Sequence, residues 1–219
     1  MVARWSHKDL TMYVDDGAIY AVSATANAAA TSALIGYKKV LCWLEENGLC
    51  ANPAKNELII FPPPHTRPNL TGGQIHSGRY VNLQAQRLNI TSATTVKYLN
   101  VHISQDLKWD KHVNIIINRA RSIIRGLSVL GNSIQGLDFI NWHKVYNAVV
   151  IPTLTYGVPI WYTGKRQKGL TNHLQVTQNK GLRKMTRVFY TTLIEPLHNL
   201  THVPPILYVL EKLTKSYSL

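Results

Sequence analysis

The stretch LTMYVDDGAIYAV, residues 10–22, places two adjacent carboxylates between short apolar runs in a chain that is otherwise basic. The runs at residues 10–14 and 18–22 favour β-strands, and Asp-Gly between such runs is a strong hairpin signal. The sequence therefore predicts a hairpin with Asp15 and Asp16 at its tip. Two explanations of the acidic pair stay open: the residues only reverse the chain, or their carboxylates bind a divalent metal ion.

The segments that follow predict one helix and several strands. Residues 24–47 form the helix, with Gly48 after its last turn and apolar side chains at helical spacing, namely Leu34, Tyr37, Val40, Leu41 and Leu44. Strands are expected at residues 57–61, 79–83 and 96–103, and the stretch PPPHTRPNLTGG reads as a loop. Strands and a helix in this order indicate an α+β layer for residues 1–108.

The second half of the chain is predicted to be all-helical. Asp110 can cap a helix that ends at Gly131, and its apolar face consists of Val113, Ile116, Ile117, Ala120, Ile123, Ile124, Leu127 and Leu130. Further helices are expected at about residues 138–150 and 169–188, and from Pro204-Pro205 to the C-terminus. This change of character places a domain boundary at about residue 108.

The charge balance points to a polyanionic partner. The chain holds 24 Lys and Arg against 11 Asp and Glu, a formal net charge of +13. No acid occurs between Phe139 and Ile194, where eight cations fall, and four of these share a helical sector about 100° wide: Lys180, Arg183, Lys184 and Arg187. Leu182, Met185 and Phe189 lie opposite them. A solvated helix face is one explanation, and a nucleic-acid interface is the other.

Other sequence features limit where the protein acts. Cys42 and Cys50 have no metal-ligand spacing, and the N-terminal residues contain no apolar core of signal-peptide length. The longest apolar run is interrupted by Pro152 and Pro159 and is too short to span a bilayer. We therefore expect an intracellular protein, nuclear or cytoplasmic and not secreted, that has no membrane partner.

Several motifs in order resemble reverse transcriptases of non-LTR (LINE-type) retrotransposons, and are like the lineages common in fungi. The motifs are YVDD, GLCANPAKNELIIF, VKYLNVHISQDLKWDKHV, LTYGVPIW and QNKGLRKMTRVFYTT. The resemblance implies that residues 1–108 are a partial polymerase palm, with a Y-x-D-D hairpin, a helix and antiparallel strands. Residues 109–219 would be the helical thumb and the connection region that follows it.

The same resemblance implies roles for individual residues. Asp15 and Asp16 would be two of three carboxylates that bind Mg²⁺ or Mn²⁺, and Lys55 would lie near the phosphates of the incoming dNTP. Tyr13 would lie beside the primer end, and the turn at Leu99 and Asn100 would belong to the primer grip. The RNA template and DNA primer would be clamped by the helical region, with the cations Lys180, Arg183, Lys184 and Arg187 as contacts.

The departures from the family pattern shape the expected function. The family's first catalytic Asp, its fingers and its PQGS-type nucleotide loop find no match in the chain, while Asn100 replaces a usual Gly and Ser104 a usual Asp. We therefore expect a fragment of an RNA-directed DNA polymerase, a two-metal nucleotidyltransferase, that is inactive alone. The alternatives are a non-catalytic basic nucleic-acid-binding module and a non-functional retroelement relic.

Overall fold

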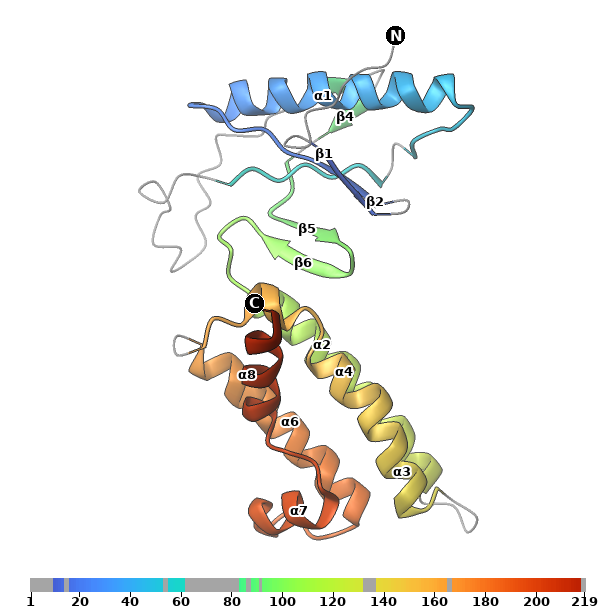
Figure 1. The fold of residues 1–219 in the computed structure, drawn as a ribbon, viewed down its shortest axis with the longest axis vertical. Helices are drawn as coiled ribbons and strands as arrows, with labels where there is room; N and C mark the ends of the chain where they lie inside the picture. Colours follow the sequence, from blue (N-terminus) through green and yellow to red (C-terminus); the bar gives the residue numbers. More distant parts are fainter. Residues whose placement is uncertain are drawn as a thin grey trace. The chain divides into compact units, whose positions relative to one another are not determined.

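The chain forms two compact units, Met1–Lys108 and Trp109–Leu219 (Figure 1). The computed structural model describes residues 10–13, 16–52, 55–61, 83–85, 88–90, 92–131, 137–164 and 167–217. Helices and small antiparallel sheets occur together, which is compatible with the expected α+β class.

Unit 1 begins with the predicted hairpin and helix. Strands β1 (Leu10–Tyr13) and β2 (Asp16–Ile19) pair antiparallel, and helix α1 (Ala26–Glu46) follows. The Thr25 hydroxyl caps α1 by accepting a hydrogen bond from the Ala28 N–H at 3.2 Å. Gly48 has a φ of +70°, so the predicted glycine after the helix is confirmed.

Helix α1 packs closely on strand β2. A Cβ added to Gly36 would lie 3.2 Å from the Ile19 Cγ2, so the glycine permits this approach. The predicted apolar face turns inward, with Leu41 buried and Leu34 and Tyr37 half-buried. Of the described residues of unit 1, only Ala30, Leu41 and Val101 are buried, so this part of the unit encloses little core.

The strand predicted at residues 57–61 is wrong. Leu58 forms one isolated parallel bridge with Ser92, and the Ala93 N–H donates to the Leu58 carbonyl at 2.7 Å. The segment facing it at residues 92–94 is irregular, so no ladder extends beyond this bridge. The prediction at residues 79–83 lies outside the described residues except for Leu83, which opens the hairpin β3 (Leu83–Ala85) and β4 (Leu88–Ile90).

The single strand predicted at residues 96–103 is instead a tight hairpin. Strands β5 (Thr95–Tyr98) and β6 (Val101–Ser104) pair antiparallel around Leu99 and Asn100. Both turn residues have positive φ, 46° and 62°, as a two-residue hairpin turn of type I′ requires. The apolar pattern concealed the turn because its signal depends on one asparagine and not on glycine.

The regular secondary structure among the described residues of unit 2 is all helical, as predicted. The helices are α2 (Asp110–Gly131), α3 (Phe139–Val145), η3 (Tyr146–Val150), α4 (Ile151–Leu154), α5 (Val158–Trp161), α6 (Lys168–Thr186), α7 (Ile194–Thr201) and α8 (Ile206–Tyr217). Helices α5 and α7 were not predicted. In Figure 1, α2 lies beside α4. Helix α6 also contacts α2, and α8 contacts α5 and α6.

The second predicted helix continues past Pro152 instead of ending before it. Pro152 has no N–H to donate to the carbonyl four residues earlier, so an ordinary α-helical turn is interrupted there. The residues before it, Tyr146–Val150, adopt the wider π-helical turn, and the Ile151 N–H donates to the Tyr146 carbonyl. This turn joins α3 and α4 into one rod.

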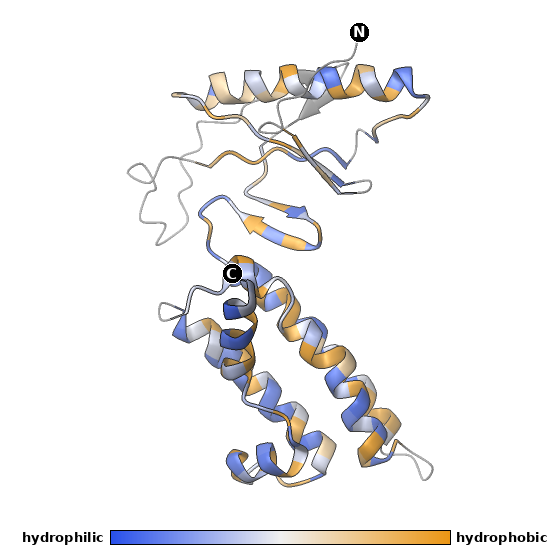
Figure 2. Ribbon diagram, in the orientation of Figure 1, coloured by the Kyte–Doolittle hydropathy of each residue, from blue (hydrophilic) through white to orange (hydrophobic). Residues whose placement is uncertain are grey.

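The core of unit 2 lies between these helices, whose hydrophobic and hydrophilic residues occupy different faces (Figure 2). Every apolar residue predicted on α2 is buried or half-buried except Leu130, which is 59% exposed on the last turn. Gln178 is fully buried but satisfied, since its side chain donates to the Pro204 carbonyl and accepts from the Ile206 N–H, both at 2.8 Å. This side chain ties the start of α8 to α6. No described helix is long and apolar enough to cross a membrane.

Candidate functional site

The hairpin register places Asp16 and Gly17 in a strand. Tyr13 pairs with Asp16, and Met12 pairs with Gly17. The Asp-Gly dipeptide is therefore not the turn that its sequence favours, and Asp16 is the first residue of β2. Asp16 is thus the strand residue that directly follows the chain reversal, while Asp15 lies outside the described residues, so both explanations of the acidic pair stay open.

Tyr13 and Asp16 project from the same face of the hairpin because directly paired residues of antiparallel strands share a face. Tyr13 is 65% exposed, and Asp16 is exposed as well. Within the described part of the chain, the Asp16 carboxylate has no hydrogen-bond or ion-pair partner. A phenol and a carboxylate are thus presented together to solvent.

The described residues do not by themselves complete a metal site. Mg²⁺ is held by several oxygen ligands in near-octahedral geometry. Among the residues that the structure describes, no group of three or more His, Cys, Asp or Glu side chains could hold a metal ion. Asp16 contributes one exposed carboxylate, and its neighbour Asp15 lies outside the described residues, so the described part alone does not provide a complete set of metal ligands.

Lys55 lies on a short connection that is fixed at two points within unit 1. Its own N–H donates to the Asn52 carbonyl at 3.1 Å, and its side chain is exposed. The Asn56 side chain donates to the Tyr37 hydroxyl of α1 at 2.6 Å, and Glu57 accepts from the Lys97 N–H of β5 at 3.1 Å. No hydrogen bond or ion pair among the described residues joins Lys55 to Asp16.

The predicted primer-grip turn has an unusual backbone. Asn100 is exposed with a φ of 62°, a conformation that asparagine adopts more readily than most residues. Leu99 is half-buried with a φ of 46°, which is strained for a branched side chain. The family usually has glycine at the position of Asn100, and the positive φ there explains why backbone freedom is needed.

The cationic sector predicted on α6 is only partly available to a partner. Lys180 and Lys184 are exposed. The guanidinium of Arg183 donates to the Thr192 carbonyl at 3.0 Å, and that of Arg187 donates to the Gly131 carbonyl at the end of α2. A cation at a helix C-terminus also faces the negative end of the helix dipole, so Arg187 stabilises the packing of α2.

The prediction that Phe189 packs opposite the cations is wrong. Helix α6 ends at Thr186, and Arg187 adopts a left-handed conformation with a φ of 56°. Beyond that point the angular increment of a helix no longer applies, and Phe189 is 85% exposed. Leu182 and Met185, which precede the helix end, are buried as predicted.

Two exposed cations on one side of α2, Lys111 and Arg125, were not among the predicted site residues. Unit 2 contains fourteen Lys and Arg against four Asp and Glu, so it carries most of the net charge. Lys111, Asn118 and Arg125 recur at intervals of seven residues on the exposed side of α2. Their signal in the sequence is the seven-residue spacing of polar residues, which places them on one side of the helix.

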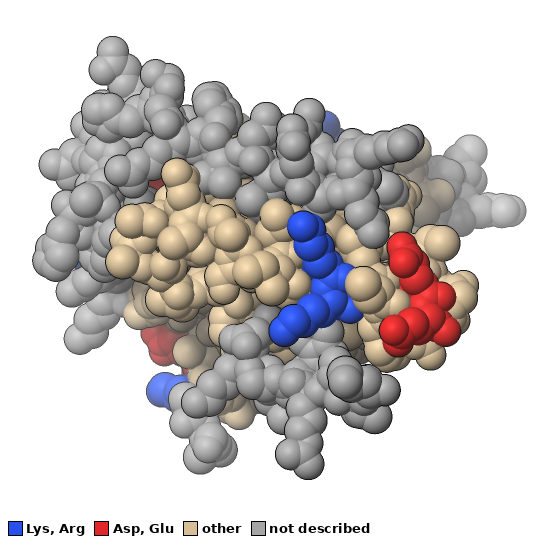
Figure 3. Space-filling model, turned by 90° about the horizontal axis from the view of Figure 1, so that it is seen from above, with Lys and Arg blue, Asp and Glu red and all other residues tan. Residues whose placement is uncertain are grey.

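The exposed side of α1 in unit 1 is different. It carries two basic and two acidic exposed residues, Lys38, Lys39, Glu45 and Glu46. Seen from above in Figure 3, the described part of the surface shows a basic cluster, a separate acidic cluster and smaller charged spots near its edges. The exposed charges on α1 balance, whereas unit 2 carries most of the net positive charge of the chain.

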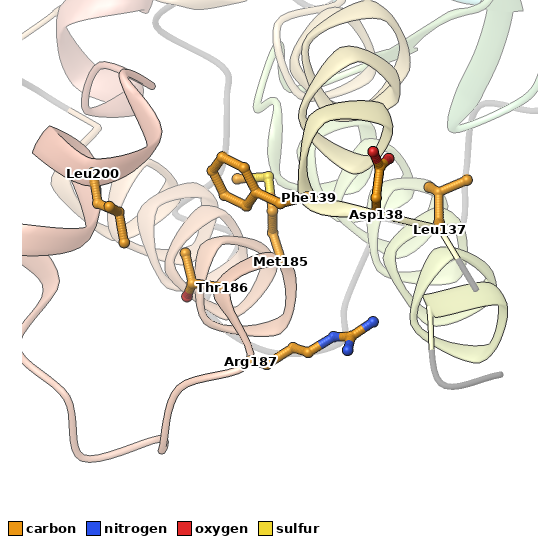
Figure 4. A pocket seen from close by; sticks show the side chains of 7 residues that line it. All are labelled: Leu137, Asp138, Phe139, Met185, Thr186, Arg187 and Leu200. Atoms are coloured by element: carbon orange, nitrogen blue, oxygen red, sulfur yellow. The ribbon is translucent and has the colours of Figure 1, made fainter. Parts of the chain in front are cut away.

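A shallow hollow of about 350 Å³ lies in unit 2 where α3, α6 and α7 meet (Figure 4). Its lining residues are Leu137, Asp138, Phe139, Met185, Thr186, Arg187 and Leu200. The two charged groups have structural partners, because Asp138 caps α3 by accepting from the Asn141 N–H and Arg187 donates to Gly131. The hollow therefore lacks the converging polar groups that a catalytic pocket needs.

Comparison with known proteins supports one family at a distance. The chain is 24% identical, over 213 residues and 95% of its length, to a probable RNA-directed DNA polymerase from transposon BS of Drosophila melanogaster. It spans 22% of the length of that relative. No protein-family model and no solved structure matches the chain. The resemblance to reverse transcriptases thus has independent support at the level of a distant relationship.

Proposed function

We propose that this chain is part of an RNA-directed DNA polymerase of the non-LTR retrotransposon type, like the lineages common in fungi. The observation that carries the proposal is the similarity to a transposon RNA-directed DNA polymerase along 95% of the chain. The relative is much longer than the chain, so the activity of the whole enzyme is part of the proposal. Unit 1 would belong to the palm, and unit 2 to the thumb and the connection after it.

The carboxylate hairpin would act at the polymerase site. Asp15 and Asp16 would supply two of the metal-binding carboxylates, and Tyr13, which shares a face with Asp16, would contact the primer end. Bound Mg²⁺ or Mn²⁺ would stabilise the charge on the attacking and leaving oxygens of nucleotidyl transfer. Lys55 would approach the phosphates of the dNTP, where an ammonium group favours developing negative charge.

The 219 residues alone are expected not to synthesise DNA, because the family's first catalytic Asp has no match among them and two carboxylates without the third should bind and position a metal ion poorly. The assay is extension of oligo(dT) on poly(rA) with Mg²⁺ or Mn²⁺ and dTTP. Incorporation should not exceed that of a protein-free control. Robust synthesis that disappears in the Asp15→Ala variant would contradict this expectation.

Nucleic-acid binding without catalysis is the second candidate function, and the charge of unit 2 favours it. Binding of the same poly(rA)/oligo(dT) duplex should weaken linearly on a plot of log affinity against log salt. Replacing Lys180 and Lys184 by Ala should lower the slope by roughly 0.7–0.9 for each phosphate contact that is lost. Lys38 and Lys39 of unit 1 provide the matched control, since their replacement should leave the slope unchanged. If all three proteins give one slope, α6 does not contact the phosphates.

A further inference from the structure

The turn between α6 and α7 presents two adjacent aromatic side chains to solvent. Phe189 is 85% exposed and Tyr190 is 84% exposed, more than the other large aromatics of the described residues. Phenylalanine and tyrosine usually bury most of their surface, because water contact with an aromatic ring is unfavourable. Two exposed aromatic rings at adjacent positions of the chain therefore suggest that this turn has a binding partner.

Hydrogen bonds hold this aromatic turn, residues 188–193, against α6. The Val188 N–H donates to the Arg183 carbonyl at 3.2 Å, which closes the helix end. The Thr192 N–H donates to the Phe189 carbonyl at 3.1 Å and closes a tight turn around Tyr190. The Arg183 guanidinium then binds the Thr192 carbonyl at 3.0 Å. Little backbone entropy remains to be lost when a ligand binds to such a fixed turn.

The charge beside the turn is positive. Lys180 and Lys184 are exposed on the last two turns of α6, immediately before the aromatic turn. The sequence from Phe139 to Ile194 holds no acid, and the first carboxylate after the turn is that of Glu195 at the start of α7. Exposed rings that follow exposed lysines along the chain are a combination that suits single-stranded nucleic acid, because its bases stack on the rings and its phosphates meet the cations.

We propose that the aromatic turn stacks unpaired bases of a single-stranded RNA or DNA segment, while Lys180 and Lys184 meet its phosphates. The proposal rests on the proposed nucleic-acid binding of unit 2 and adds a preference for single strands. A duplex keeps its bases stacked on each other, so it offers the two rings no free base face. The rings thus distinguish single strands from duplexes, whereas the lysines bind both.

The test compares the Phe189→Ala/Tyr190→Ala double variant with the unaltered full chain. Fluorescence anisotropy is measured with labelled (dT)20, labelled (rU)20 and a labelled 20-bp duplex over a range of salt concentrations. Single-strand affinity should fall roughly 5- to 150-fold for each stacked base. Duplex affinity should stay unchanged, and the salt slope should also stay unchanged because no cation has been removed.

Two further variants control for folding and for loss of aromatic surface elsewhere. Tyr208→Ala removes a ring that is 61% exposed on α8 of the same unit, and it should leave every affinity unchanged. Phe189→Trp/Tyr190→Trp should retain single-strand binding, and its fluorescence should be quenched on titration with (dT)20. Thermal unfolding of each variant should match that of the unaltered chain, because the replaced rings are exposed.

Each other outcome overturns the proposal in a distinguishable way. Unchanged (dT)20 and (rU)20 affinity in the double alanine variant would exclude stacking while the nucleic-acid function stands. Equal losses for single strands and duplex would exclude the single-strand preference. A variant that loses only binding to anionic lipid vesicles, or only self-association, would assign the rings to a membrane or a protein partner. If the unaltered chain binds none of the three probes, the proposed nucleic-acid function fails as well.

Discussion

Replacing Gly181 by Ala tests how closely α6 approaches its neighbours in unit 2. A Cβ at this position would lie 2.7 Å from the Tyr146 Cε2, 3.1 Å from its hydroxyl oxygen and 3.2 Å from the Ile124 Cδ1. Tyr146 is fully buried and stacked on Trp142, with 6.2 Å between ring centroids, so its ring has little space to move. The added methyl group would overpack the contact of α6 with Tyr146 and Ile124, which should cost about 1–3 kcal/mol of stability.

Gly126 on α2 is the matched control. It is exposed within a helix, and an added Cβ there would meet no atom within 4 Å. Gly126→Ala should therefore stabilise the protein by up to about 1 kcal/mol through helix propensity alone. Gly181→Ala gains the same propensity, so the difference between the two variants isolates the packing cost of about 1–3 kcal/mol, or roughly 2–12 °C in Tm.

The assay is urea denaturation followed by tryptophan fluorescence, together with differential scanning calorimetry. Combining Gly181→Ala with Tyr146→Leu should cost less than the sum of the two single changes, because the clashing ring is then gone. A Gly181→Ala variant that is as stable as Gly126→Ala would refute the close crossing of α6 at Tyr146.

Two further predictions concern the buried tyrosine and the β5–β6 turn. Burial raises the pKa of Tyr146 above its ordinary value, so the unfolded state ionises first as the pH rises. The stability that the neutral phenol contributes is therefore fully present below pH 10 and is lost as the pH rises further. Tyr146→Phe should be less stable by about 1 kcal/mol at pH 8, through loss of the hydrogen bond to the Gln178 carbonyl, and this deficit should shrink or reverse at pH 11 in urea denaturation. Asn100→Val should destabilise the protein by about 1–2 kcal/mol at a φ of 62°, whereas Asn100→Gly should be nearly neutral. Equal stability of the two Asn100 variants in thermal unfolding would contradict the left-handed turn.

The helices were predicted from the sequence with small errors because their signals are local. The apolar spacing of α2 predicted its buried face, and Leu130 is exposed because it lies about 100° from the middle of that face, while Gly131 beside it is buried against Trp142. The glycine after α1 and the start of a helix at about Asp138 depend on neighbouring residues alone, so they were predicted as well; the capping bond of Asp138 was not. The short helices α5 and α7 span too few turns to give a periodic signal.

Strand pairing was predicted less well because it depends on partners distant in sequence. Residues 57–61 have a strand-like composition, but their neighbour at Ser92 pairs at a single bridge. Asp16-Gly17 has a turn-like composition, but its pairing with Tyr13 and Met12 places it in β2. In both cases the cross-strand partner decided the conformation, and local preference did not.

The sequence alone determined the helical character of the second half, the excess of positive charge there and the presence of a carboxylate pair beside an apolar run. These properties follow from residue types and their spacing along one chain. Only the tertiary structure decided which of the cations are available and which aromatics are exposed. Arg183 and Arg187 bind the carbonyls of Thr192 and Gly131, and the second of these lies 56 residues away in the sequence. A side chain's partner is set by the folded path of the whole unit, which no local pattern encodes.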